Sequence, residues 1–144
     1  MRKIIYIFLT ILVCVLITTV IASANSSEKI VEDLICQRTD VLSLYYAGEL
    51  NKKDTIEKIR GITTSHLRQS DIENLEKYFQ CDLEQVRGYK IRDIKVTYSD
   101  KDVICANATI DWAAEGFKGA DNFVHTYSII CEKEENLYKM AQFF

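Results

Sequence analysis

The apolar positions of this chain fall into one continuous run followed by periodic patterns. The run covers Ile4 to Ala22, nineteen residues without a charge, a proline or a glycine. As a helix it would be about 28 Å long, close to the thickness of the hydrocarbon core of a bilayer. Arg2 and Lys3 precede it, and basic residues favour the cytoplasmic side of a membrane. The pattern therefore predicts a cytoplasmic N-terminus and an exported domain.

Two interpretations of this first segment stay open. Ala22-Ser23-Ala24 matches the small-residue pattern that signal peptidase recognises, and cleavage after Ala24 would produce a secreted domain. The apolar run is longer than the usual core of a signal peptide, which favours an uncleaved, single-pass anchor in the cell membrane. Both interpretations divide the chain into a leading segment, residues 1–24, and one extracytoplasmic domain, residues 25–144.

Helical periodicity follows the apolar run. Apolar residues at helical spacing predict a first helix over residues 25–47, ended by Gly48. A short second helix is predicted over residues 52–60, with Asn51 as its N-cap and Gly61 just after its last turn.

A third helix is predicted from a stronger start signal. Ser70 and Glu73 have the spacing of a capping box, and apolar residues continue on one helical face to about Gly88. His66 precedes this signal and is expected in a loop, where a ligand role is the less common outcome.

The pattern then changes from helical to alternating. Alternation of apolar and polar residues predicts four strands, at about residues 90–99, 104–112, 122–132 and 137–144, joined by short turns. Helices followed by consecutive strands are typical of α+β folds. The expected fold is therefore three helices packed on a four-stranded antiparallel sheet.

This order of elements resembles a known superfold. Three helices, then a meander that ends in the strand Leu137-Tyr138-Lys139-Met140-Ala141-Gln142-Phe143-Phe144, resemble the NTF2-like (cystatin-like, cone-shaped) fold over residues 28–144. With its apolar leader, the chain is similar to small membrane-anchored proteins of Gram-positive bacteria. The resemblance is architectural and implies a concave sheet face, without assigning a catalytic residue.

Charge and composition exclude some classes of function. The chain has 18 basic and 21 acidic residues, a net charge of −3, and two of its cations precede the apolar run. No basic patch with interleaved aromatic residues occurs, so nucleic-acid binding is not expected. The sequence contains no glycine-rich phosphate loop and no metal-ligand spacing, so no cofactor and no metal are expected. The lack of proline argues against an extended linker between the membrane and the domain.

Four cysteines lie in the exported part, which makes disulfides a hypothesis. A hairpin that turns about Lys118 would place Cys105 opposite Cys131, on one face of adjacent strands. Cys36 and Cys81 would then pair by elimination. The alternative is that all four are buried free thiols that act as small apolar residues.

The same register would bring Asp111 opposite His125, with Tyr127 further along that face. A carboxylate beside an imidazole can orient it for general acid–base catalysis. These three residues are the only catalytic candidates, and they are weak, because no nucleophile or oxyanion donor accompanies them. A polar pair at the edge of a pocket is the more common outcome.

Other prominent side chains have simpler interpretations. Arg38 lies near the apolar stripe of the first helix; it could pair with a carboxylate inside the cone, but extension of its charge to solvent is the simpler account. Trp112 and the aromatic residues of the last strand are expected in core and strand-end packing. Those of the last strand are Tyr138, Phe143 and Phe144.

The leading functional hypothesis is a membrane-tethered extracytoplasmic interaction domain without catalysis, which binds an envelope protein or a small ligand. The first alternative is a pocket enzyme that uses Asp111 and His125. The second, carried by the resemblance alone, is a VirB8-like scaffold subunit of a conjugative secretion complex.

Overall fold

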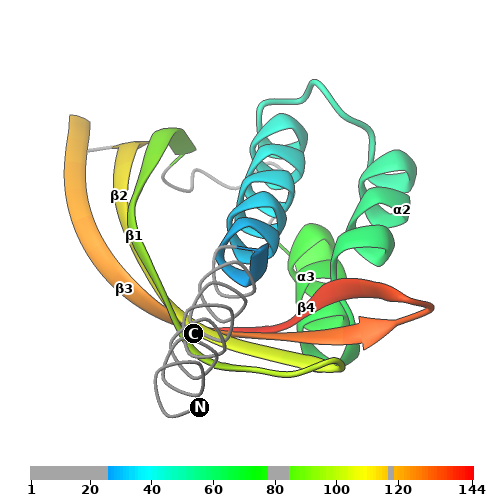
Figure 1. Cartoon of the computed structure of the whole chain (residues 1–144). Helices are drawn as coiled ribbons and strands as arrows, with labels where there is room; N and C mark the ends of the chain where they lie inside the picture. Colours follow the sequence, from blue (N-terminus) through cyan, green and yellow to red (C-terminus); the bar gives the residue numbers. More distant parts are fainter. Residues whose placement is uncertain (1–25, 78–84, 117–118) are drawn as a thin grey trace, which may run out of the picture.

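A computed structural model describes residues 26–77, 85–116 and 119–144. Within these ranges the chain forms a long helix over residues 26–46, two shorter helices and four strands (Figure 1). The shorter helices are α2 (Lys52–Ile62) and α3 (Ser65–Lys77). The strands are β1 (Gln85–Ser99), β2 (Val103–Gly116), β3 (Gly119–Glu134) and β4 (Leu137–Phe143).

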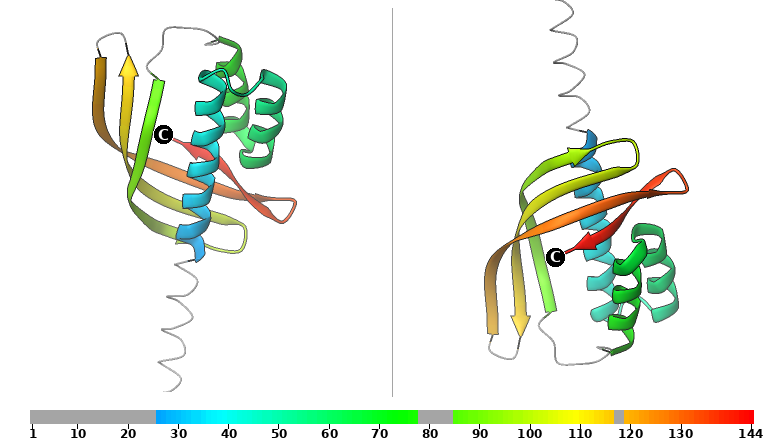
Figure 2. Two further views of the ribbon diagram at one scale, coloured as in Figure 1. Left: turned by 90° about the horizontal axis from the view of Figure 1, so that it is seen from above. Right: turned by 90° about the horizontal axis from the view of Figure 1, so that it is seen from below.

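The strands form one antiparallel sheet in sequence order, and the three helices pack against it. The predicted fold class, three helices on a four-stranded antiparallel sheet, is confirmed. The sheet is strongly bent, and the helices lie on its concave side, with α2 and α3 near β4 (Figures 1 and 2). The first predicted segment, residues 1–24, lies outside the described residues. Among the described residues, no helix has the length and apolarity needed to cross a membrane.

The core lies between the concave face of the sheet and the helices. Every second residue of β2 is buried, as strand alternation requires. They are Ile104, Ala106, Ala108, Ile110, Trp112 and Ala114. The long helix contributes Val31, Leu34, Ile35 and Val41 to the same cluster. Each large aliphatic side chain buried in this way contributes about 1.5–3 kcal/mol relative to exposure.

Two of the predicted helix-end signals, Gly48 and Asn51, are confirmed. The long helix stops before Gly48, whose φ of 76° is the left-handed conformation that glycine adopts readily. The side chain of Asn51 accepts a hydrogen bond from the Asp54 N–H at 3.0 Å, so the predicted N-cap is confirmed. Gly61 does not end α2, which continues to Ile62.

The start of α3 was predicted wrongly, five residues late. It begins at Ser65, so His66 lies in its first turn and Ser70 within it. Thr63 forms a parallel bridge with Met140, and the Thr64 N–H donates to the Met140 carbonyl at 2.9 Å. This pairing with β4 fixes the chain just before Ser65, and it is invisible in the local sequence. The predicted end of the helix near Gly88 is also wrong, because β1 begins at Gln85.

Two tight turns set the hairpins. At the β3–β4 turn, Glu135 and Asn136 have φ values of 53° and 67°, the two positive angles that a type I′ hairpin needs. At the β1–β2 turn, the Asp100 carboxylate accepts hydrogen bonds from the Asp102 and Val103 N–H groups, at 2.8 and 2.7 Å. The four strands were therefore located correctly, although three are longer than predicted.

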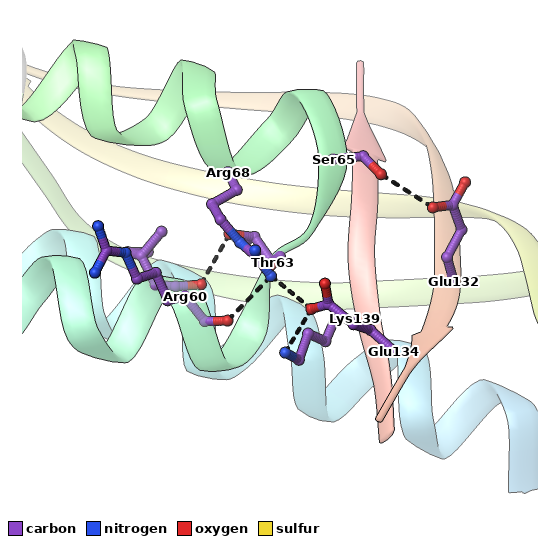
Figure 3. A network of polar contacts seen from close by, with 8 residues as sticks. Arg60, Thr63, Ser65, Arg68, Glu132, Glu134 and Lys139 are labelled. Atoms are coloured by element: carbon purple, nitrogen blue, oxygen red, sulfur yellow. Dashed lines mark hydrogen bonds and ion pairs between the residues drawn. The ribbon is translucent and has the colours of Figure 1, made fainter. Parts of the chain in front are cut away.

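A polar network attaches the α2–α3 junction to the β3–β4 hairpin (Figure 3). The Arg68 guanidinium donates to the Thr63 carbonyl at 2.7 Å and to the Glu134 carboxylate at 2.6 Å. The Lys139 ammonium, mostly buried, donates to the same Glu134 oxygen at 2.6 Å. One carboxylate thus joins two cations from different elements, and it complements the backbone pairing of Thr63 and Thr64 with β4.

This network makes stability depend on pH. Hydrogen bonds from Lys139 and then Arg68 lower the pKa of Glu134 below its ordinary value of 4.5. A carboxylate with a lowered folded-state pKa contributes stability above the unfolded pKa and loses it as the pH falls through the folded pKa.

We expect Glu134→Gln to reduce the free energy of unfolding at pH 7 and to flatten its decrease between about pH 5 and pH 3. Urea denaturation across this range measures it. Glu57→Gln, an exposed change on α2, is the control, and equal acid sensitivity of all three proteins would contradict the assignment.

Candidate functional site

The candidate site is the open half of the concave sheet face. β4 pairs only with the C-terminal part of β3, from Ser128 to Glu134, so β1, β2 and the first half of β3 extend beyond it. Figure 2 shows this extension curling toward the long helix. Five residues at the border of this half contact one another in a chain that runs from the long helix and α3 to the strands, and we refer to them as the concave site: Arg38, Asp71, Trp112, Tyr127 and Phe143.

A buried ion pair joins two helices at the concave site. Arg38 on the long helix donates from Nε and Nη2 to the two carboxylate oxygens of Asp71 on α3, at 2.9 and 2.6 Å. The side chains are 16% and 4% exposed. The guanidinium carbon also lies 5.1 Å from the centre of the Phe143 ring, a cation–π distance. The hypothesis that Arg38 pairs with a carboxylate is therefore correct, and its partner Asp71 was not predicted.

Aromatic rings cross the concave face from strand to strand. Tyr89 on β1 lies 5.8 Å from Trp112 on β2, and Trp112 lies 6.1 Å from Tyr127 on β3. Tyr127 stacks on Phe143 of β4 at 4.3 Å, and the exposed His125 ring lies 4.7 Å from Tyr127. Such edge-to-face and stacked contacts are each worth about 0.5–1.5 kcal/mol beyond the buried area, so they favour these ring orientations. Burial raises the pKa of the Tyr127 hydroxyl, which therefore stays protonated at neutral pH.

A cavity of about 240 Å³ separates the C-terminal half of the long helix from β1 and β2. Its lining includes Arg38, Leu42 and Tyr46 from the helix and Val86 and Trp112 from the strands. The Trp112 indole N–H is buried and makes no hydrogen bond with the described residues. Ligand sites for whole small molecules usually enclose about 300–1,000 Å³, so this cavity suits a single side chain or a small group.

The predicted Asp111–His125 pair is wrong. Asp111 lies opposite Val124 and His125 opposite Ile110, one residue away from the predicted register. A shift of one residue moves a side chain to the other face of a sheet. Asp111 thus lies on the convex face and pairs with Arg92 at 2.6 Å, while His125 and Tyr127 lie on the concave face. The candidate pair therefore has no shared pocket.

The predicted Cys105–Cys131 bridge is wrong for the same reason. Cys105 lies opposite Ile130 and Cys131 opposite Ile104, so the two thiols are on opposite faces, and both are free. Cys131 is fully buried, and burial raises the pKa of its thiol to about 12, so it is unreactive at neutral pH. Cys36 is also a free thiol, and its predicted partner Cys81 lies outside the described residues.

The remaining predicted side chains divide between core and surface. Trp112 is buried as expected, whereas Phe144 is 68% exposed. Tyr138 is half-buried, and its hydroxyl donates to the Asp100 carbonyl at 2.9 Å. His66 lines a shallow groove with Leu67 and Phe144, away from any cluster of ligating groups. Within the described ranges, no group of three or more His, Cys, Asp or Glu side chains has the arrangement of a metal site.

Comparison with known proteins identifies similarity of fold. No family model and no curated protein matches the chain. Among solved structures, it is similar to the crystal structure of the intermembrane space region of the chloroplast protein ARC6, with a TM-score of 0.52 and 10% sequence identity. The match covers 81% of this chain and 94% of that one. At this identity the likeness concerns the fold alone: an α+β fold with an antiparallel sheet, compatible with the NTF2-like architecture.

Substitutions in the Arg38–Asp71 ion pair test how much the pair contributes to the free energy of unfolding. We expect Asp71→Ala to lower the free energy of unfolding by about 3–5 kcal/mol, because it leaves a mostly buried guanidinium without its partner. The double variant Arg38→Met/Asp71→Leu should recover most of this loss, since both charges are removed together. Thermal and urea unfolding measure both effects. The exposed pair of Lys52 and Glu76 serves as a matched control, and the Glu76→Ala change should cost less than about 1 kcal/mol. A double variant as unstable as Asp71→Ala would contradict this account.

Proposed function

We propose that this chain is a membrane-tethered, extracytoplasmic binding domain of NTF2-like architecture, without catalytic activity, whose partner occupies the concave site. The observation that carries the proposal is a cavity of about 240 Å³ beside the concave face, lined by Trp112 of the aromatic row and by Arg38, which is paired with Asp71. The partner is an envelope protein or a small ligand.

The tether is supported by the sequence and by the position of the long helix. The apolar run ends at Ala22, and the described helix already begins at residue 26. Few residues separate the two, so the domain would stand close to the membrane surface. The cavity-lining part of this helix, residues 38–47, begins about 18 Å further along it at 1.5 Å per residue. The concave site would then lie at the end of the helix remote from the tether.

The binding role is supported by the chemistry of the concave site. Rigid aromatic rings supply contact area at a low cost in conformational entropy, as they do in many binding surfaces. The buried Trp112 N–H makes no hydrogen bond of ordinary geometry within the described residues, and it interacts with the Tyr127 hydroxyl, whose pKa burial raises and this contact lowers. Asp71 already holds the Arg38 guanidinium in place, so the charge is positioned before any ligand arrives. Asp111 and His125 lie on opposite faces, so these two residues do not form an acid–base pair beside them.

The proposed location gives the first test. In cells that express the full chain, a membrane-impermeant, amine-reactive biotin reagent should label the domain's lysines, and the protein should remain in the membrane pellet after an alkaline carbonate wash. Removal of residues 2–24 should abolish both results, because the chain then lacks its export and anchoring segment. A chain that is labelled only after cell lysis would refute the extracytoplasmic location. A labelled chain recovered in the medium would identify a cleaved signal peptide.

The proposed binding site gives a second test. A photoreactive phenylalanine analogue at position 86 lies at the cavity, whereas α2, which carries the exposed position 57, contributes no residue to its lining. Illumination of intact cells should produce a discrete adduct from position 86 and none from position 57. Ser43→Trp should fill the cavity and remove the adduct, and Glu57→Trp should leave it unchanged. Mass spectrometry of the purified chain measures the added mass. Identical adducts from both positions, or none from position 86, would exclude the site.

A further inference from the structure

The first half of β3 has an unpaired outer edge. β2 pairs with β3 along its whole length, but on the other side β4 reaches only Ser128. Beyond that point, residues 121–127 have no strand beside them among the described residues. A row of unused backbone N–H and C=O groups of this kind is a template for another strand.

The hydrogen-bond pattern identifies which groups point outward. The Ser128 N–H donates to the Phe144 carbonyl at 2.7 Å, and the Phe144 N–H donates to the Ser128 carbonyl at 3.2 Å. Backbone groups alternate sides along a strand, and the β2–β3 ladder runs without a register shift. The N–H and C=O groups of Asn122, Val124 and Thr126 therefore point to the free edge, in line with the end of β4.

The free edge of β1 differs from the free edge of the first half of β3. β1 carries Arg87, Lys90, Arg92 and Lys95, and its pairing with β2 shifts register at three places. Cationic side chains and bulges are the usual protection against edge-to-edge association. Residues 121–127 contain no lysine, no arginine and no irregularity. The contrast indicates that the β3 edge is left open for pairing.

The side chains beside the free edge indicate what would bind there. Phe123, on the concave face, is 42% exposed, and Val124, on the convex face, is 51% exposed. Asp121 is the one carboxylate in this stretch, and it is exposed. A matching strand therefore has apolar or β-branched side chains on both faces and a basic residue opposite Asp121.

We propose that the free edge of β3, residues 121–127, binds an extended segment of a partner protein, which adds to the sheet as an antiparallel strand in line with β4. The backbone groups of Asn122, Val124 and Thr126 supply the hydrogen bonds, and apolar side chains of the segment pack beside Phe123 and Val124. The inference rests on the proposed binding function and names the chemistry of its partner.

A second copy of this chain fits the edge less well than a peptide segment does. Stable interfaces between rigid domains involve roughly 20–30 residues on each side, and only seven residues are free here. Beyond Ser128 the edge is occupied by Phe144, so the pairing cannot be extended in that direction. A flexible segment needs no further surface, because the main-chain hydrogen bonds themselves supply its affinity.

The test uses the full-length chain in detergent and peptides selected against it from a random library of 12-residue sequences. We expect selected peptides to alternate apolar and polar residues and to slow amide hydrogen exchange at Asn122, Val124 and Thr126. Val124→Pro removes one outward N–H that the domain itself does not use, and it should weaken peptide binding at least about tenfold. Val124→Thr keeps that N–H and should bind as the parent does.

A second test changes the peptide and not the protein, so its result does not depend on whether the Val124→Pro variant folds correctly. N-methylation of the alternate peptide amides that face β3 should abolish binding, whereas methylation of the other set should leave it intact. Binding that ignores Val124→Pro and both methylation sets but is lost with Ser43→Trp would overturn the edge proposal and leave the concave site standing. Failure to select any peptide, or dimerisation of the chain that Val124→Pro abolishes, would also overturn it.

Discussion

The architecture depends on a mismatch between two paired strands. β3 has 16 residues and β4 has seven, so β4 covers only the C-terminal part of its neighbour. α2 and α3 contact β4, whereas the bent part of β1–β3 that β4 does not reach lies beside the long helix (Figure 2). A β4 as long as β3 would pair the edge at Val124. The unpaired edge is thus a direct consequence of one short strand.

Two charge networks hold the helices on this uneven sheet. Glu134 links Lys139 and Arg68 at the hairpin end, and Asp71 links Arg38 to α3 beside the open half. Removing both charges of a buried pair is often neutral for stability, so stability alone does not account for the Arg38–Asp71 pair. Its position against Phe143 places a fixed cation at the border of the cavity. The pair therefore fixes the position of the guanidinium beside Phe143 at the cavity lining.

Much of the fold was predictable from periodicity, and most of the site was not. Alternation located all four strands and helical spacing located the helices, because these patterns report which face is buried. The start of α3 at Ser65 depends on pairing between Thr64 and Met140, a contact that no local signal carries. The hairpin between β2 and β3 was predicted one residue out of register, and that error alone placed His125 on the same face as Asp111 and Cys131 on the same face as Cys105. Asp71 was not predicted as the partner of Arg38, because this contact depends on the position of α3. The sequence pattern placed the start of that helix five residues too late.

The position of the open half relative to the tether limits which partners can reach it. The described part of the long helix starts at residue 26, close in sequence to the predicted anchor, and the cavity lies along the last turns of the helix, near Tyr46. On the proposed topology, the concave site and the β3 edge face away from the membrane attachment and not into the lipid headgroups. A peptide segment from a neighbouring envelope protein can approach from that side as an extended chain. The same short strand that opens the edge therefore favours an extended partner, whose main chain can pair with the free groups of β3.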